Sequence, residues 1–280
     1  MLIVALILLV LVLLGLAVTI ADLRFDRMVR DEQDRLRSMI VHPVADRGTD
    51  GLPASVVTWL ERSGAADRPP IASVRMDQRL QMRLRPDQAD WTEARSQQIV
   101  SVDPPAFHWT VRLRMMGVLP VRGRDRFQDG HGEMRISLLS MVPVVNAMDD
   151  PAIDEASLQR FLAEIVWYPT AARHPAIRWD AEGDHAARAT LQVGDVTATG
   201  VFSFDATGGL ASFSAQRFRG AGDDATRSLW TVTALDHATF QGVRVPSRVE
   251  ATWTLNDGTD WTWLRMEVTD VVYDDLNTTP

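Results

Sequence analysis

The 280 residues are 46% hydrophobic and 24% charged, which is ordinary for a folded protein with a sizeable core. The formal net charge of -8 argues against a nucleic-acid partner, because such proteins are usually basic. The chain has no cysteine, which excludes disulfides, thiol nucleophiles, thiolate metal sites and a lipid-modified N-terminal cysteine.

Residues 2–21 are apolar except for Thr19 and carry no charge. About 20 such residues match the ~30 Å hydrocarbon core of a bilayer, so we predict that residues 1–21 are a single-pass transmembrane anchor. The alternative is a cleaved signal peptide. Residues 19–21 are an acceptable cleavage site, although no basic residue precedes the apolar run.

The expected location is therefore a bacterial cell (inner) membrane, and the side that the rest of the chain faces is left open. Arginines that follow the apolar run favour a cytoplasmic C-terminal part by the positive-inside rule, whereas single N-terminal anchors often export β-rich domains. These arginines are Arg24, Arg27, Arg30, Arg35 and Arg37.

Residues 22–52 are expected to form a juxtamembrane helix and a linker. Dense mixed charge with apolar residues at helical spacing continues to Ile40, and the following segment to Pro53 is rich in Gly, Asp and Pro. A short helix is predicted over residues 54–62, ended by Ser63-Gly64. We predict one β-rich domain over residues 53–273 and a polar tail over residues 274–280.

From Pro70 onward the hydrophobic period changes from 3.6 to 2, which indicates strands with one dry and one wet face. We expect about five strands before residue 154 and about seven after it. The predicted fold is mainly β (α+β). It is a strongly curved antiparallel sheet or half-open barrel of about a dozen strands with one central helix, preceded by the transmembrane helix.

The central helix is predicted over residues 154–170, DEASLQRFLAEIVWYPT. Asp154 is the expected N-cap, and Pro169 is expected to move Tyr168 out of helical geometry. The apolar residues recur at the spacing of one helix face, which should be buried against the sheet. They are Leu158, Phe161, Leu162, Ile165 and Val166.

The back of this helix carries the candidate site. Arg160, Glu164 and Trp167 share the side opposite the apolar face, and a Trp is rare on a solvated face. In a groove, the Arg and Glu would hold the polar end of a ligand and the Trp would pack against its body. The alternative is an i, i+4 ion pair beside a Trp that seals an interface. The candidate ligand-binding residues are Arg160, Glu164, Trp167, Tyr168 and Arg217.

Several motifs resemble an uncharacterised bacterial domain-of-unknown-function family. The most specific is RFLAEIVWYPT at residues 160–170. The others are WLERSG at 59–64, GRD at 123–125 with DGHG at 129–132, FSFD at 202–205 with Arg217-Phe218, and Val245-Pro246 leading to Trp253. The resemblance covers about residues 53–273 and implies no established activity. The strand pattern is also similar in outline to lipoprotein-carrier-type half-barrels, a likeness of architecture alone.

No catalytic residue, metal or cofactor is predicted, and whether the protein is an enzyme is left open, with a non-catalytic role favoured. The chain has no GxSxG, Walker or GxGxxG motif, and its six histidines show no HxH, HxxxH or HExxH pairing. Asp125, Asp129 and His131 superficially suggest a cation loop, but an Asp-Gly hairpin explains them better. His108 is expected on the solvated face of its strand.

Two further features bear on membrane contact. Trp261 and Trp263 alternate in phase with Arg265, opposite Leu264. The apparently wet side of this last strand is therefore covered or in contact with lipid, or both faces are partly buried there. Arginines gather on the wet side of the strands between residues 71 and 140, facing anionic headgroups or solvent. They include Arg75, Arg79, Arg83, Arg112 and Arg114.

These features favour a membrane-anchored binding module for a lipid-like or other apolar ligand. The expected partners are the membrane and a lipid or hydrophobic small molecule. Nucleic acid is not expected, and the oligomeric state is left open. The alternatives are an enzyme that uses Glu164 as a general acid or base, and a non-catalytic envelope scaffold or interaction domain.

Overall fold

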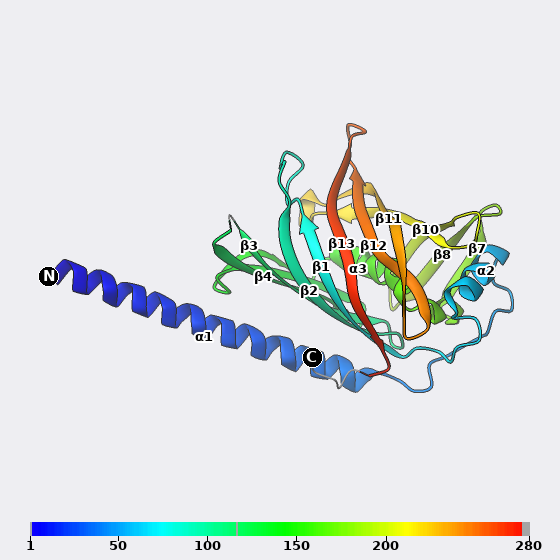
Figure 1. Cartoon of the computed structure of the whole chain (residues 1–280), viewed down its shortest axis with the longest axis horizontal. Coiled ribbons are helices and arrows are strands. Elements are labelled where there is room, and N and C mark those ends of the chain that lie inside the picture. The colour runs from blue at the N-terminus through cyan, green and yellow to red at the C-terminus, as the bar shows by residue number, and fades with distance from the viewer. Residues whose placement is uncertain (1, 116, 276–280) are drawn as a thin grey trace.

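The structure, a computed structural model, describes residues 2–115 and 117–275 and consists mainly of one antiparallel sheet curled into a half-barrel (Figure 1). Each wing of the sheet is a meander, so strands that are neighbours in the sequence are hydrogen-bonded neighbours. One wing runs outward from β1 to β6 and the other from β13 to β7. The wings meet where β1 pairs with β13, and β6 and β7 are the open edges. The predicted fold class is confirmed.

The described residues form 13 strands, six before the central helix and seven after it. The first wing contains β1 (Ser73–Met82), β2 (Thr92–Ser101), β3 (Ala106–Met115), β4 (Leu119–Gln128), β5 (His131–Leu138) and β6 (Val142–Ala147). The second contains β7 (Ile177–Ala181), β8 (Ala186–Val193), β9 (Val196–Phe204), β10 (Leu210–Arg219), β11 (Thr226–Phe240), β12 (Val243–Thr254) and β13 (Asp260–Tyr273). The structure has one strand more than the five expected before the central helix. A short edge strand such as β6 is easily missed, because its sequence VPVVNA lacks strict alternation.

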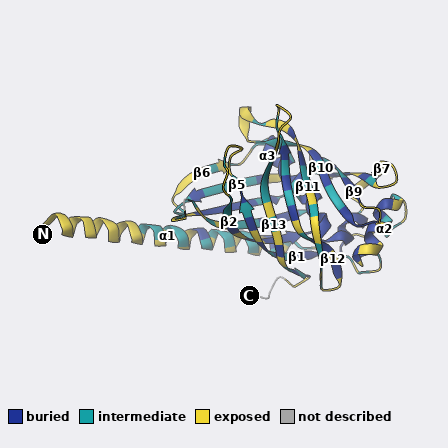
Figure 2. Cartoon of the chain, turned by 45° about the horizontal axis from the view of Figure 1, so that its top comes forward, coloured by how far each residue is buried: buried dark blue, intermediate teal, exposed yellow. Residues whose placement is uncertain are grey.

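Burial alternates along the strands and places the main core on the concave side of the sheet (Figure 2). In β12, for example, Val243, Val245, Val249 and Ala251 are buried. Helix α2 (Ala54–Ser63) packs against this core and ends at Gly64 as predicted, and Gly64 has a left-handed conformation with φ 74. A Cβ on Gly64 would lie 2.9 Å from the carbonyl oxygen of Gly242, so this close approach also requires glycine.

The central helix α3 spans Pro151–Glu164. It begins earlier than predicted, because Asp150 rather than Asp154 is the N-cap. The Asp150 carboxylate accepts a hydrogen bond from the backbone N–H of Ala152 at 2.8 Å, and a proline occupies the first turn. The Asp154 carboxylate instead accepts from the backbone N–H of Gly132 at 2.7 Å, which ties the helix to β5.

Past Glu164 the helix tightens into the 3₁₀ helix η1 (Ile165–Trp167). Tyr168 then leaves helical geometry, at φ -137 and ψ 68, as the following proline predicts. A second 3₁₀ helix, η2 (Pro169–Arg173), leads into β7. The predicted apolar face is buried throughout, including Phe161 at 1% exposure.

Helix α1 (Leu2–Met39) is continuous over 38 residues, but its two halves differ. The N-terminal half is long and apolar enough to cross a membrane and is entirely unburied, a pattern shared by single-pass anchors and signal sequences. The C-terminal half, the predicted juxtamembrane helix, packs along the convex side of β2 and β3 (Figure 1).

This packing corrects the prediction for His108, which is 1% exposed rather than solvated. Its Nε2 lies 2.9 Å from Oε2 of Glu32 in α1, and Glu32 also pairs with Arg124 at 3.1 Å. Asp26 of α1 lies 3.3 Å from Arg112. Acidic residues of α1 therefore cover part of the arginine-rich face that sequence analysis assigned to headgroups or solvent.

Trp261 and Trp263 line the concave side together with Leu264, which corrects their predicted phase. The pairing of β12 with β13 shifts register at Ala251–Thr252. Such a bulge inserts an extra residue and reverses the inward–outward alternation beyond it. Strict alternation read from the sequence fails for this reason.

The segment predicted as a polar tail begins with Asp274. Its carboxylate accepts hydrogen bonds from the backbone N–H groups of Ala72 at 2.8 Å and Ser73 at 3.0 Å, which ties the end of β13 to the start of β1. Residues 276–280 lie outside the described residues.

Candidate ligand-binding cavity

A cavity of about 470 Å³ lies between α3 and the concave face of the sheet. Inward-facing positions of strands from both wings line it, because alternate side chains of a strand share one face. The lining is mainly aliphatic, aromatic and methionine side chains, among them Leu80, Met82, Trp109, Val111, Trp230 and Met266.

Arg160 is the centre of a buried polar cluster on the α3 side of this cavity. Its Nε donates to Oε1 of Glu164 at 2.7 Å, and its Nη1 donates to Oδ2 of Asp125 at 2.6 Å. Its Nη2 donates to the side-chain oxygen of Gln98 at 3.1 Å. The Gln98 amide in turn donates to the other oxygen of Glu164. Each polar side of the guanidinium therefore has a protein partner.

The guanidinium of Arg160 also lies over two aromatic rings, 4.8 Å from the ring centre of Phe107 and 4.9 Å from that of Trp109. Burial alone would lower the pKa of Arg160, but the charges of Glu164 and Asp125 outweigh burial and raise it. Arg160 is thus a permanently charged, fixed part of the cavity wall.

Arg217 enters the same cavity from β10 and is bound differently. Its Nε donates to the carbonyl oxygen of Ala156 at 3.1 Å, and its guanidinium lies 4.6 Å from the ring centre of Trp230 and 5.7 Å from that of Trp253. Within the described parts of the chain it forms no ion pair, and no hydrogen bond from its terminal nitrogens is found. These nitrogens are therefore available as donors.

The pKa of Arg217 is lowered to about 10, chiefly because burial disfavours the charged form. The carboxylates of Asp125 and Glu164 oppose this shift, and the charge of Arg160 adds to it. Arg217 still carries its proton at neutral pH, so the cavity contains a cation without a carboxylate of its own.

The remaining two candidate residues have different positions. Trp167 lines the cavity, and its Nε1 donates to the carbonyl oxygen of Pro246 at 2.9 Å. Tyr168 does not reach the cavity. It is fully buried, its ring centre lies 5.9 Å from that of Phe161, and its hydroxyl donates to the Phe161 carbonyl oxygen at 3.3 Å. Burial and the nearby charge of Glu164 raise the pKa of Tyr168 well above its ordinary value.

The structure thus brings Arg160, Glu164, Trp167 and Arg217 to one cavity. Asp125 also lines it, and Gln98 belongs to the polar cluster around Arg160; neither was predicted for this site. Asp125 is 3% exposed, and Gln98 is completely buried. Gln98 occupies an inward position of β2 between the buried Ser96 and Val100. A long polar side chain at a strand position that otherwise faces the core is the sequence signal that could have identified Gln98 as a member of a buried polar cluster.

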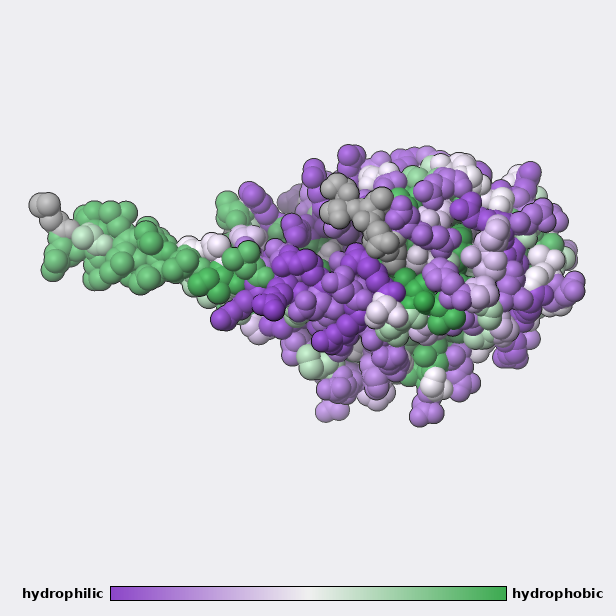
Figure 3. Space-filling model, turned by 90° about the horizontal axis from the view of Figure 1, so that it is seen from below, coloured by the Kyte–Doolittle hydropathy of each residue, from purple (hydrophilic) through white to green (hydrophobic). Residues whose placement is uncertain are grey.

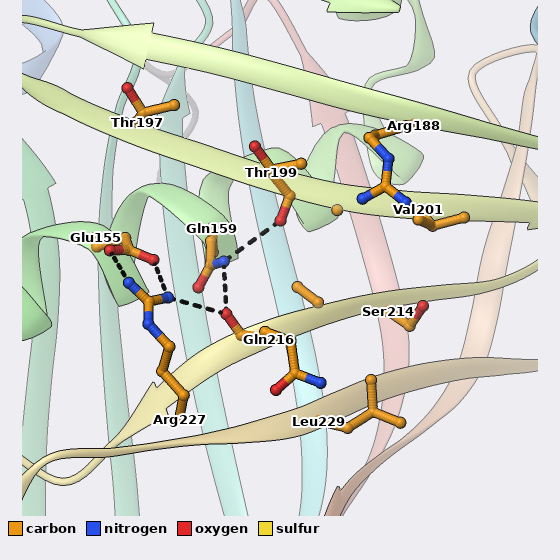
Figure 4. Close-up of a pocket in the computed structure, with 12 residues that line it drawn as sticks. Glu155, Gln159, Arg188, Thr197, Thr199, Val201, Ser214, Gln216, Arg227 and Leu229 are labelled. Carbon is orange, nitrogen blue, oxygen red and sulfur yellow. Dashed lines mark hydrogen bonds and ion pairs between the residues drawn. The ribbon is translucent and has the colours of Figure 1, made fainter. Parts of the chain in front are cut away.

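A second pocket, of about 380 Å³, lies beside α3 over β9 and β10 (Figure 4). The side-chain amide of Gln159 donates to the backbone carbonyls of Thr199 at 3.3 Å and Gln216 at 3.1 Å. Gln159 therefore bridges β9 and β10 beyond the end of their backbone pairing, which in the described chain stops at Ser214 and Val201. At the rim, Glu155 pairs with Arg227 at 2.5 Å. The Gln159 amide nitrogen and the Glu155–Arg227 pair are thus bound within the protein, whereas the buried Gln159 side-chain oxygen has no hydrogen-bond partner in the described chain. We assign this pocket a structural role.

The chemistry available in the large cavity is limited. Among the described residues that line it there is no Ser, Thr or His, so Asp125 and Glu164 are its general acid or base candidates. In the described ranges no group of three or more His, Asp or Glu side chains is placed to hold a metal ion.

Comparisons with known proteins give a family match and several solved structures that align with this chain. The family described as "Family of unknown function (DUF6920)" matches residues 50–273. No curated protein matches the chain. A DUF1329 family protein from Desulfovibrio piger is 9% identical, with 82% of this chain and 96% of that chain covered and a TM-score of 0.39.

A β-barrel-like DUF1849 protein from Brucella abortus is 10% identical, with 74% of this chain and 99% of that chain covered and a TM-score of 0.24.

Proposed function

We propose a function for this chain, which belongs to the family of unknown function DUF6920: it is a membrane-anchored module that binds a lipid-like, largely apolar ligand between α3 and the curled sheet. The observation that carries the proposal is the cavity, in which about 470 Å³ is left unfilled by side chains. Ligand sites typically have volumes of about 300–1,000 Å³, with apolar walls and a few placed polar groups. A scaffold domain would be expected to have this concave face packed solid.

An apolar ligand suits this cavity better than water does. Protein interiors are close-packed, and voids larger than a water molecule lose dispersion contacts on their walls. Water in a mainly aliphatic and aromatic cavity finds few hydrogen-bond partners. An acyl chain or similar apolar body would restore the missing contacts and remove its own surface from water.

Arg217 supports a ligand with an acidic end. Arg160 is committed to Glu164, Asp125 and Gln98, so it organises the cavity wall and has little left to offer a ligand. Arg217 is partly desolvated, cationic and not ion-paired in the described chain. A guanidinium of this kind can hold a carboxylate or phosphate through paired N–H donors.

The proposed membrane anchor is residues 1–21, followed by the juxtamembrane segment 22–52 and the β-rich domain 53–273. The exposed apolar half of α1 supports this arrangement, since about 20 helical residues span ~30 Å of hydrocarbon. The anchor would keep the cavity beside a large supply of apolar ligands.

Photo-crosslinking tests the proposal on the full chain in lipid nanodiscs. A long-chain fatty acid with a diazirine on its alkyl chain is added and irradiated, and the modified peptides are mapped by mass spectrometry. We expect crosslinks on strands that line the cavity. Ala234→Phe, at a partly exposed lining position, should fill the cavity and reduce these crosslinks. Ala181→Phe, at an exposed position outside the lining, is the matched control.

Crosslinks confined to α1, or equal cavity crosslinks in Ala234→Phe and the control, would contradict the proposal. The acidic end is tested separately with the fatty alcohol of the same length. Arg217→Met should lower the crosslinking yield of the acid much more than that of the alcohol. An equal loss for both probes would mean that Arg217 shapes the cavity without recognising the head group.

The enzyme alternative rests on one observation: Glu164 faces the cavity, and Arg160 and Gln98 converge on it. Both of its oxygens already accept hydrogen bonds from the protein, so the carboxylate is held in place by Gln98 and Arg160. If Glu164 is an acid or base, a ligand recovered from the wild-type chain should be chemically converted over time, and Glu164→Gln should leave it intact but bound.

A further inference from the structure

A second apolar surface lies outside the cavity, at the tips of two neighbouring hairpins. Val118 lies in the turn between β3 and β4, and Met141, Val142 and Val144 lie at the turn between β5 and β6 and along β6. Their exposures are 72%, 43%, 55% and 57%. We call these four residues the hairpin rim. Single exposed apolar residues are common on proteins, but a contiguous group points to a contact surface.

The two tips lie side by side, because the backbone N–H of Leu139 donates to the carbonyl oxygen of Pro120 at 2.8 Å. They also lie against α1 at one defined level. The Ser140 hydroxyl donates to Oδ1 of Asp22 at 2.5 Å, and Nη1 of Arg122 donates to the Asp22 backbone carbonyl at 3.4 Å. Asp22 is the first charged residue after the apolar run, so the rim lies where the apolar half of α1 leaves the sheet (Figure 2).

The relation between the rim and the apolar half of α1 is fixed by packing. Phe25 is 6% exposed under the guanidinium of Arg122, which lies 4.4 Å from its ring centre. Further along, Leu36 is 2% exposed and packs with Ile99 and Ala106. Since α1 is one continuous helix, these contacts fix its projecting half relative to the sheet. Figure 3 shows this projecting half as an apolar rod that ends at the charged surface of the folded part.

We infer that the hairpin rim rests on the bilayer that holds residues 2–21, so that the cavity opens toward the membrane surface. This inference builds on the anchor and ligand of the proposed function. Val144 belongs both to the rim and to the cavity lining, and Met115, at the end of β3, also lines the cavity. The exposed side chains of Arg24 and Arg27 lie just beyond the apolar run, where anionic headgroups would be within reach.

The bilayer fits this surface better than a second protein chain does. Apolar side chains at loop tips, next to arginines and at the end of a membrane-length helix, match the boundary between headgroups and acyl chains. A rim in this position would also shorten the path of an apolar ligand from bilayer to cavity, because the ligand need not cross water.

Single-cysteine labelling tests the inference directly, since the natural chain has no cysteine to remove. Val118→Cys and Val142→Cys variants of the full chain are labelled with an environment-sensitive fluorophore and placed in lipid nanodiscs. The matched control is Leu235→Cys on β11, which is 53% exposed against 55% for Val142. Doxyl-labelled lipid should quench both rim labels several-fold more than the control label, and aqueous iodide should quench the control label more.

The inference would be overturned if doxyl-labelled lipid and iodide quenched the rim labels to the same degree as the control label. Labels shielded from both quenchers would also overturn it, because they would indicate contact with protein. The crosslinking experiment keeps this result separate from the proposed function. If the cavity is crosslinked but lipid does not quench the rim labels, the proposed ligand site is supported and the contact between rim and bilayer is refuted. If lipid quenches the rim labels but the cavity is not crosslinked, the contact with the bilayer is supported and the ligand site is refuted.

Discussion

Truncation of Phe161 to Ala should destabilise the protein more than neutralisation of Glu164 on the same helix. Phe161 is 1% exposed, belongs to the main core, and its ring centre lies 5.9 Å from that of Tyr168. Buried Phe→Ala substitutions cost about 3–5 kcal/mol, of which the lost aromatic pair accounts for about 0.5–1.5 kcal/mol. This is much of the ~5–15 kcal/mol stability of a typical domain.

Glu164→Gln removes a charge but keeps the shape of the side chain. Arg160 retains its ion pair with Asp125 at 2.6 Å, and the amide oxygen that replaces a carboxylate oxygen can still accept a hydrogen bond. Because these groups are largely buried, we expect a cost of about 1–3 kcal/mol, more than for a surface ion pair but less than for Phe161→Ala. Phe161→Leu, which keeps most of the apolar volume, should cost roughly 1–2 kcal/mol.

The assay is urea unfolding of the full chain in detergent micelles, followed by the fluorescence of its nine tryptophans. The free energy of unfolding should fall in the order wild type, Glu164→Gln, Phe161→Ala. If Phe161→Ala is tolerated and Glu164→Gln collapses the protein, our account of the two sides of α3 is wrong. The groove argument built on Arg160 and Glu164 would then fail with it.

Three further predictions concern other parts of the fold. Gly132→Ala should lower the free energy of unfolding by about 1–3 kcal/mol in the same urea assay, because its Cβ would lie 2.7 Å from the carbonyl oxygen of Ile153. Burial alone would raise the pKa of Glu133, but hydrogen bonds from Arg126 and a second arginine lower it from 4.5 to about 2. The Glu133 ion pair therefore stabilises the fold above pH ~4.5 and loses this effect as the pH falls toward 2. Glu133→Gln should cost about 1–2 kcal/mol at neutral pH, allowing for solvent screening, and almost nothing near pH 2. Deletion of residues 1–21 should leave a folded domain whose far-ultraviolet circular dichroism loses only the helical signal of the deleted residues and keeps that of the sheet; a chain that unfolds without these residues would contradict the separate core described here.

Local pattern was enough to predict most elements of the fold. Alternation identified the strands because each has one buried face, and the 3.6-residue period identified α3 because its apolar side packs on the sheet. The predictions failed where a distant residue decides the outcome. His108 is buried because α1 packs over β3 and places Glu32, 76 positions away in the sequence, against it. Trp261 faces inward because a bulge opposite β12 shifts the register.

The candidate site shows the same limit. Helical spacing was enough to place Arg160 and Glu164 together on one side of α3, since i and i+4 positions are neighbours on a helix. The partners Asp125 and Gln98 come from β4 and β2, and no spacing along the chain relates them to the helix. Only the curvature of the sheet brings them under α3.

Native mass spectrometry of the full chain tests the central claim most directly. The wild-type protein is released from detergent micelles in the gas phase, and the mass of any bound molecule is measured. We expect wild type and the control Ala181→Phe to retain an acyl-chain ligand and the cavity-filling Ala234→Phe to lose it. A wild-type chain without any bound apolar molecule, or one whose ligand is retained equally by Ala234→Phe, would contradict a ligand site between α3 and the sheet.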